Sequence, residues 1–298
     1  MLQSIKTSRR KPGKLERQNI GYLFIAPSLL LYAVFVFIPI FWTIGLSFTD
    51  YNLKTSTFVG FANYQNLFKD AVFLKAFWNT INYTLLALVP TMALGLALAM
   101  LINKRFRGRA FFRALFYMPN IISIVASSLA WMYLYSEVGI LNMGLRAIGL
   151  GRVQWLNNPS ISLACVVVVS LWGSGGYNML LFLSGLQSIP THLYEAASID
   201  GANGWQQFLK ITIPQLAPTT FFVFVMTCIQ SFQVFGQVYM MTGGGPDNAT
   251  TTLAHQIYTN AFQYYKMGYA SAMAVALLCV IMLITGINFR FGNTDGGE

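Results

Sequence analysis

Six apolar runs, each long enough to cross a lipid bilayer as a helix, dominate this sequence. A membrane-spanning helix needs about 20 predominantly apolar residues, and the runs cover approximately residues 20–47, 80–102, 114–135, 160–187, 216–240 and 268–288. Only 9% of the 298 residues are charged, whereas soluble domains carry about 25%. Such a chain cannot cover itself with a solvated surface. We therefore predict an all-α membrane protein with six transmembrane helices, the first being a retained span rather than a signal peptide.

The distribution of Lys and Arg predicts the orientation. Thirteen of the 19 lie in the N-terminal segment, the second and fourth loops and the C-terminal segment, and six lie in the other three loops. Because cytoplasmic loops carry the excess of cations, we expect both termini to be cytoplasmic. The predicted organisation is a basic tail at 1–19, a six-helix domain at 20–289 and a second tail at 290–298.

The three outer loops are long and rich in turn residues, which predicts ordered caps over the spans. They cover residues 48–79, 136–159 and 241–267. The stretch TGGGPDN at 242–248 has two interpretations, a tight turn or a flexible lip at the outer mouth of a pathway.

The net charge of +10 does not indicate nucleic-acid binding. The cations gather in two clusters beside apolar runs, without interleaved aromatic residues that could stack on bases. The clusters consist of Lys6, Arg9, Arg10, Lys11, Lys14 and Arg17, and of Lys104, Arg105, Arg107, Arg109 and Arg113. We interpret both as cytoplasmic anchors of the spans and expect a lipid bilayer, but no nucleic acid, as a partner.

Several classes of transporter are disfavoured by what the sequence lacks. No Lys, Arg, Asp or Glu occurs within 114–135, 153–194 or 211–246, although proton- and ion-coupled carriers place ionisable residues at membrane depth. No phosphate-binding G-x-x-x-x-G-K-[ST] loop occurs either. The stretch GSGG at 173–176 is interpreted as a point of close packing or a break in the fourth helix. We therefore expect any energy for active transport to come from another subunit.

The loop between the fourth and fifth spans predicts a short amphipathic helix that suits a docking knob. Thr191 is a candidate N-cap with Glu195 close behind it, and Gly201 or Gly204 can end the helix. Pro214 and Pro218 then mark the return to the membrane.

This loop resembles the signature of binding-protein-dependent ABC importer permeases. Glu195, Ala196 and Ala197 are followed after three residues by Gly201, then after nine more by Ile211 and by Pro214. The one departure is Ile213, where the family usually has Leu. Nearly the whole chain is also similar to carbohydrate permeases of the maltose and glycerol-phosphate type, first-permease type. The matching segments are YLFIAPSLL at 22–30 with Pro39, GFANY at 60–64, NT at 79–80, RALFYMP at 113–119 and MTGGGPDNAT at 241–250.

The resemblance implies that the loop at 190–214 is a coupling helix that inserts into a cleft on an ATPase subunit. The residues expected to couple are Glu195, Ala196, Ala197, Asp200, Gly201 and Ala202. ATP and Mg would be bound by that partner ATPase and not by this chain, for which we expect no cofactor and no enzymatic activity. The implied assembly has a homologous second permease, two ATPase copies and a solute-binding protein, in the bacterial cytoplasmic (inner) membrane.

Polar residues at helical spacing inside the spans indicate a substrate pathway. On the third span, Asn120, Ser123, Ser127 and Trp131 share a face, and on the fifth, Gln230, Gln233 and Gln237 do so. On the fourth span, Trp172, Tyr177 and Asn178 flank the GSGG stretch. Amides and hydroxyls can satisfy sugar OH groups while aromatic rings cover their C–H faces. The alternative is that these residues bond between helices, as Ser, Asn and Gln do in membranes.

The leading interpretation is the permease of an ATP-driven importer for a carbohydrate such as an oligosaccharide. A permease for glycerol phosphate or a polyol is the first alternative, which the absence of membrane-depth cations weighs against. A secondary transporter or channel, and a receptor or scaffold, are less favoured because neither needs the signature loop. An enzyme has little support, since no catalytic constellation or metal-ligand cluster is evident.

Overall fold

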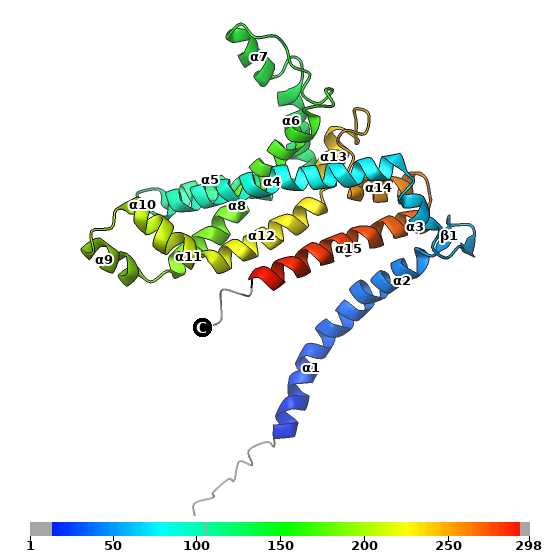
Figure 1. The fold of residues 1–298 in the computed structure, drawn as a ribbon, viewed down its shortest axis with the longest axis horizontal. Coiled ribbons are helices and arrows are strands. Elements are labelled where there is room, and N and C mark those ends of the chain that lie inside the picture. Colours follow the sequence, from blue (N-terminus) through cyan, green and yellow to red (C-terminus); the bar gives the residue numbers. More distant parts are fainter. Residues whose placement is uncertain (1–13, 105, 293–298) are drawn as a thin grey trace, which may run out of the picture.

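The computed structural model describes residues 14–104 and 106–292 and consists almost entirely of helices (Figure 1). The predicted tails at 1–19 and 290–298, and Arg105 of the second basic cluster, lie largely outside the described residues. The elements in chain order are α1 (Lys14–Tyr32), π-helical turn η1 (Ala33–Phe37), α2 (Ile38–Leu46), β1 (Thr49–Tyr51), β2 (Ser56–Phe58), α3 (Ala62–Leu67), α4 (Ala71–Asn103), α5 (Arg109–Ile121), α6 (Ile124–Tyr135), α7 (Ile140–Ala147), α8 (Ser162–Ser188), α9 (Thr191–Ile199), α10 (Gly204–Gln207), η2 (Phe208–Thr212), α11 (Ile213–Gln215), α12 (Ala217–Phe232), α13 (Gly236–Met241), α14 (Leu253–Tyr258), η3 (Thr259–Gln263) and α15 (Met267–Gly292).

Six segments of the described chain have the length and apolarity to cross a membrane, which confirms the predicted fold class. They are Phe24–Leu46, Ala71–Asn103, Ile124–Ala147, Ser162–Ser188, Ala217–Met241 and Met267–Arg290. The second helix begins nine residues before the predicted boundary at 80, because the Asp70 side chain caps it. Its carboxylate accepts hydrogen bonds from the backbone N–H groups of Val72 at 2.8 Å and Phe73 at 3.2 Å.

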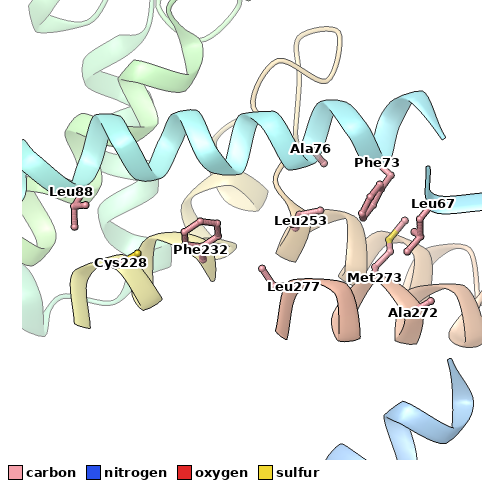
Figure 2. Close-up of a cluster of buried hydrophobic side chains, with 10 residues drawn as sticks. All are labelled: Leu67, Phe73, Ala76, Leu88, Cys228, Phe232, Leu253, Ala272, Met273 and Leu277. Atoms are coloured by element: carbon pink, nitrogen blue, oxygen red, sulfur yellow. The ribbon is translucent and has the colours of Figure 1, made fainter. Parts of the chain in front are cut away.

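The largest hydrophobic core of the described residues joins the halves of α4, α12 and α15 nearer the β-hairpin with α14 (Figure 2). Phe73 on α4, Phe232 on α12 and Met273 on α15 meet there with Leu253 of α14. A second cluster joins the halves of α4, α8 and α12 nearer the loop at 190–214. The two clusters hold the bundle together along its length, and the most extensive contact between helices is that of α4 with α8.

The first span stands apart from this bundle. No residue of its most apolar window is buried, and Figure 1 shows α1 diverging from α15 with only α2 close to it. Its side chains are therefore available to lipid or to another protein chain.

The third and fifth spans are each interrupted, contrary to the expectation of continuous helices. The predicted third span at 114–135 breaks at Ile122 and Ser123, between α5 and α6, and the membrane-length segment Ile124–Ala147 begins after this break. Figure 1 shows α6 and α7 projecting steeply from the bundle. The fifth breaks between Gln233, the C-cap of α12, and Phe235, the N-cap of α13. The sequence predicts that the polar residues of each of these spans lie on one face of an uninterrupted helix. Because both helices are broken, that arrangement on a single helix is wrong.

The fourth span, by contrast, is unbroken, so GSGG is not a helix break. The close-packing interpretation holds for its last two glycines. A Cβ on Gly176 would lie 2.1 Å from the carbonyl oxygen of Phe116 on α5, and one on Gly175 would lie 2.8 Å from Leu94 on α4. Both glycines let neighbouring helices approach α8 closely.

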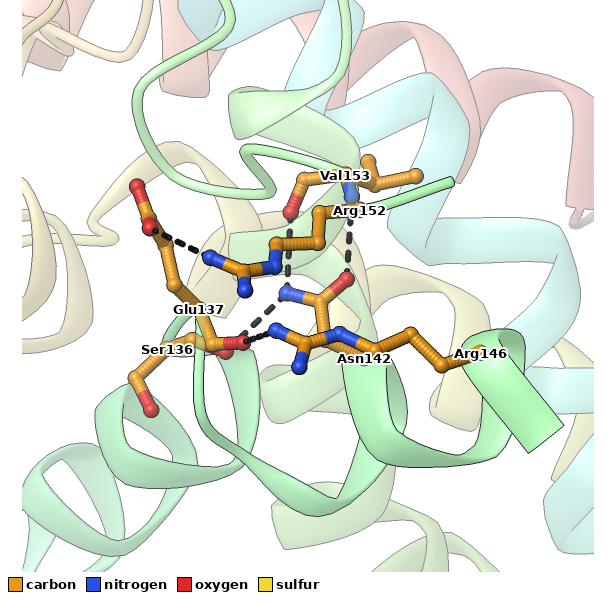
Figure 3. A network of polar contacts seen from close by, with 6 residues as sticks. All are labelled: Ser136, Glu137, Asn142, Arg146, Arg152 and Val153. Carbon is orange, nitrogen blue, oxygen red and sulfur yellow. Dashed lines mark hydrogen bonds and ion pairs between the residues drawn. The ribbon is translucent and has the colours of Figure 1, made fainter. Parts of the chain in front are cut away.

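The outer loops are ordered, as predicted, and the first contains a small antiparallel hairpin of β1 and β2 that was not predicted. In the second, buried Asn142 donates to the carbonyls of Ser136 and Val153 and accepts from Val153 N–H, each at 2.9–3.0 Å (Figure 3). Arg152 pairs with Glu137 at 3.6 Å, and Arg146 donates to the Glu137 carbonyl. In the third, Lys75 and Asn79 of α4 donate to carbonyls of the 247–251 segment. The TGGGPDN stretch is therefore a hydrogen-bonded turn fixed to α4.

Candidate functional site

A cavity of about 250 Å³ lies where the fifth span is interrupted. Its walls come from α4, α8, the end of α12, the start of α13 and Ile124 of α6. Residues 233–235, between the two helices, all line the cavity. Interrupted helices of this kind form binding sites at membrane depth in many transporters.

The cavity wall is polar but uncharged. Gln230, Gln233 and Gln237 contribute amides. Hydroxyls come from a wider set, namely Tyr83, Thr91, Ser170, Ser174, Thr227 and Ser231. No residue lining the cavity in the described part of the chain is charged. Such a wall can exchange many hydrogen bonds with a neutral polyhydroxylated ligand.

The predicted pathway residues divide into three groups in the structure. The three glutamines share the cavity although they do not share one helix. Trp131 of α6 and Trp172 of α8 meet edge-to-face, with ring centroids 5.9 Å apart.

The two tryptophans and the remaining predicted pathway residues lie outside the cavity wall. The Asn178 amide is buried and donates to Thr227 Oγ1 at 3.1 Å, a bond between α8 and α12 of the kind weighed as the alternative. Ser127 donates to the Ile124 carbonyl of its own helix. Asn120 and Ser123 are exposed on either side of the third-span break, and Tyr177 is half-buried on α8.

Several cavity residues were missed by reasoning from helical spacing. Tyr83 and Thr91 lie on α4, where isolated hydroxyls in an apolar run give no pattern to follow. Ser170 and Ser174 lie four residues apart on α8, and Tyr83 donates to Ser170 Oγ. That i, i+4 spacing was a usable signal, and it places both serines on the face that looks into the cavity.

The loop between the fourth and fifth spans forms a compact knob at the end of the bundle opposite the β-hairpin (Figure 1). Helix α9 begins at Thr191, so the N-cap is Pro190 and not Thr191, and no side chain caps it. Gly201 ends the helix as predicted, with a left-handed φ of +76°. Asn203 and Gln206 then form a capping box at the start of α10.

Hydrogen bonds fix one side of α9 and leave the other free. Tyr194 OH lies 3.0 Å from Thr212 Oγ1, and the Gln207 amide donates to Ser198 Oγ and to the Ala202 carbonyl. Among the predicted coupling residues, Glu195, Ala196, Asp200 and Gly201 are exposed and Ala197 and Ala202 are half-buried. A Cβ on Gly201 would meet nothing within 4 Å.

Two large apolar side chains beside these residues were not among those predicted. Ile199 is 87% exposed and Trp205 is 68% exposed. Exposed apolar side chains on a knob outside the membrane mark an interaction surface. The available signal was an Ile placed between the polar residues Ser198 and Asp200.

The described residues contain no group of three or more His, Cys, Asp or Glu side chains placed to hold a metal ion.

Comparison with known proteins shows the family of the chain. Residues 73–292 match the family of the binding-protein-dependent transport system inner membrane component. The chain is 38% identical to the probable ABC transporter permease protein YurN of Bacillus subtilis, covering 95% of this chain and 99% of that protein. It is 34% identical to the sn-glycerol-3-phosphate transport system permease protein UgpA of Agrobacterium fabrum (91% and 94% covered) and 35% identical to the multiple sugar-binding transport system permease protein MsmF of Streptococcus mutans (91% and 94%).

A solved structure extends the likeness to three dimensions. A chain of a bacterial alginate ABC transporter, determined in complex with alginate pentasaccharide-bound periplasmic protein, superposes with a TM-score of 0.79 at 26% identity, covering 94% of this chain and 97% of that one. The chain therefore belongs to the family of inner-membrane components of binding-protein-dependent transport systems, and it is a permease subunit of an ABC importer.

Proposed function

We propose that this permease conducts a carbohydrate, such as an oligosaccharide, delivered by a periplasmic or extracellular binding protein. The observation that carries the proposal is the uncharged cavity at the fifth-span break, where three glutamines face a set of hydroxyl groups. Neutral donors and acceptors can replace the water around sugar hydroxyls without fixing a charge. The names of MsmF and of the alginate importer support the same substrate class.

The assembly that we propose contains a homologous second permease and two ATPase copies. The ATPase would receive the α9 knob, whose exposed carboxylates Glu195 and Asp200 flank exposed Ile199. A buried apolar anchor with a polar rim is the usual energetic plan of such contacts. ATP hydrolysis, and the Mg it needs, would belong to that partner.

A phosphorylated substrate such as sn-glycerol 3-phosphate is the alternative, supported by the likeness to UgpA. Recognition of phosphate relies on Arg, Lys or converging backbone N–H groups. No cation lines the cavity within the described part of the chain, which favours the neutral sugar.

We also propose that both termini are cytoplasmic and that the chain lies in the bacterial cytoplasmic membrane. The knob carrying Glu195 and the basic segment before α5 would then share the cytoplasmic side. Single cysteines introduced at Asp200 and at Asp247 test this orientation. An impermeant maleimide added to intact spheroplasts should label the Asp247→Cys variant and spare Asp200→Cys, and the reverse pattern would refute the proposed orientation.

Uptake by the complete importer in proteoliposomes tests the substrate. The probes are radiolabelled maltose, maltopentaose, arabinobiose, arabinopentaose and sn-glycerol 3-phosphate, each offered with the cognate binding protein. We expect ATP-driven accumulation of at least one saccharide and none of the phosphate ester. For the transported saccharide, Gln230→Ala and Gln233→Ala should lower uptake about ten-fold, as expected for lost hydrogen bonds in a desolvated site. Accumulation of sn-glycerol 3-phosphate alone would overturn the carbohydrate assignment.

A further inference from the structure

Four aromatic rings form a continuous ribbon that starts at the cavity and ends on the surface of the outer region. We define the aromatic ribbon as Phe235, Tyr239, Tyr258 and Phe262. The first three rings contact one another, with centroid separations of 4.9–5.3 Å, and Phe262 follows Tyr258 at 5.3 Å. The rings come from two segments that the outer loop brings together, namely 235–239 at the start of α13 and 258–262 after α14.

One end of the aromatic ribbon belongs to the cavity itself. Phe235 lines the cavity together with Gln233 and Gln237. The other end is open, because Phe262 is 59% exposed and Tyr239 is 37% exposed.

The aromatic ribbon is less buried than the hydrophobic core. In the core of Figure 2, Phe73 and Phe232 are only 6% and 4% exposed. Within the aromatic ribbon, Tyr239 and Phe262 retain free ring surface, whereas Phe235 and Tyr258 are half-buried.

The volume of the cavity limits how much of an oligosaccharide it can enclose. At about 250 Å³ the cavity is smaller than the roughly 300–1,000 Å³ of sites that enclose a drug-sized ligand. It can hold part of an oligosaccharide, and the remaining sugar units must extend beyond it. Phe235 lines the cavity, and the other three rings continue the stack from it.

We propose that the aromatic ribbon is a second saccharide-binding site, on which the sugar units outside the cavity stack with their C–H faces. This inference rests on the proposed carbohydrate substrate and adds a length preference to it. Flat aromatic faces bind sugar rings without fixing their hydroxyls, so a saccharide can move along them. Tyr239 and Tyr258 are therefore residues that determine specificity for longer saccharides, while the glutamines of the cavity act on saccharides of every length.

The test compares a pentasaccharide with the disaccharide of the same series, using whichever of the maltose or arabinose pairs the wild-type importer transports. In Tyr239→Ala and Tyr258→Ala we expect pentasaccharide uptake at subsaturating concentration to fall about five-fold relative to disaccharide uptake, the value of one aromatic contact. Tyr239→Phe and Tyr258→Phe retain the ring and should keep the wild-type ratio. Tyr264→Ala, which removes a 61% exposed ring outside the aromatic ribbon, serves as the matched control and should also keep it.

The outcomes separate this inference from the carbohydrate assignment. If the wild-type importer transports no saccharide, the substrate assignment fails and the ribbon site falls with it. If wild-type transports both saccharides and the Ala variants lower both equally, the rings support folding or contact with the second permease, and only the ribbon site is overturned. An unchanged ratio at full uptake overturns it as well. Membrane levels of each variant, measured by immunoblot, normalise the rates.

Discussion

Two glycines of α8 differ sharply in their surroundings, although they are only three residues apart in the sequence. Gly176 lies against the backbone of α5, whereas a Cβ on Gly173 would meet nothing within 4 Å. The sequence predicted close packing for this stretch but could not assign it to particular glycines, because that depends on where α5 crosses α8.

Replacing Gly176 by Ala should therefore destabilise the protein by about 1–3 kcal/mol, as overpacking against a backbone does. Gly173→Ala is the control, and it should be neutral or stabilising by up to about 1 kcal/mol through helix propensity. Thermal unfolding in detergent measures both. Equal melting temperatures for the two variants would contradict the close contact between α5 and α8.

Substitutions at a second pair of glycines distinguish the effect of backbone strain from the effect of blocking the docking surface. Gly201 after α9 has φ +76°, and Gly149 after α7 has φ +79°, and a Cβ on either would meet nothing within 4 Å. Val at either position costs a similar 1–2 kcal/mol of left-handed strain. Gly201→Val should abolish ATP-driven uptake while the protein remains in the membrane, because the added side chain occupies the docking surface. Gly149→Val should retain most uptake. Comparable uptake by both variants would refute the coupling role of the knob.

At the scale of elements, apolar length predicted all six spans but not their interruptions. The segments at the breaks, IISI at 121–124 and FQVF at 232–235, contain neither Gly nor Pro, although Pro119 precedes the first and Gly236 follows the second. The breaks arise from tertiary packing, in which α6 lies against α13 and Gly236 admits the side chain of Ile124. The spacing of residues in the sequence does not predict such a contact. The three glutamines were nevertheless predicted to converge, because the change of direction after Gln233 keeps Gln237 on the cavity side.

Helix α14 contains a buried histidine, His255, because of which we expect the stability of this helix and of the loop before it to depend on pH. His255 is packed against Gly244, Phe235 and Tyr239, and its Nδ1 lies 3.0 Å from Thr251 Oγ1. Burial lowers its pKa below the usual 6.5. The unfolded segment then binds the proton more readily than the folded one, so stability is intact above about pH 6.5 and is lost as the pH falls towards the depressed pKa.

Hydrogen exchange of the 242–258 segment measures this effect. After correction for the intrinsic pH dependence of exchange, the segment should be less protected at pH 5.5 than at pH 7.5. His255→Gln should remove the difference, because the amide does not titrate. Equal protection of the wild type at both values would show that the buried imidazole does not control the loop.

For the whole molecule, the isolated chain leaves several apolar surfaces uncovered. The first span has no buried residue in its apolar window, the aromatic ribbon is open, and Ile199 and Trp205 are exposed on the knob. The signature at Glu195 to Pro214 predicted the position of the knob, because a short spacing pattern fixes a local structure. The cavity wall was predicted only in part, because Tyr83, Thr91 and the serines of α8 are brought together by the way four helices meet.

We propose that this permease moves a saccharide with energy from a partner ATPase. The direct measurement is uptake of radiolabelled saccharide into proteoliposomes containing the complete importer, with either the active ATPase or a variant that binds but does not hydrolyse ATP. A protonophore present in both removes any proton gradient. We expect the radiolabelled saccharide to accumulate with the active ATPase and not with the inactive variant. Saccharide accumulation that continues without ATP hydrolysis would contradict it.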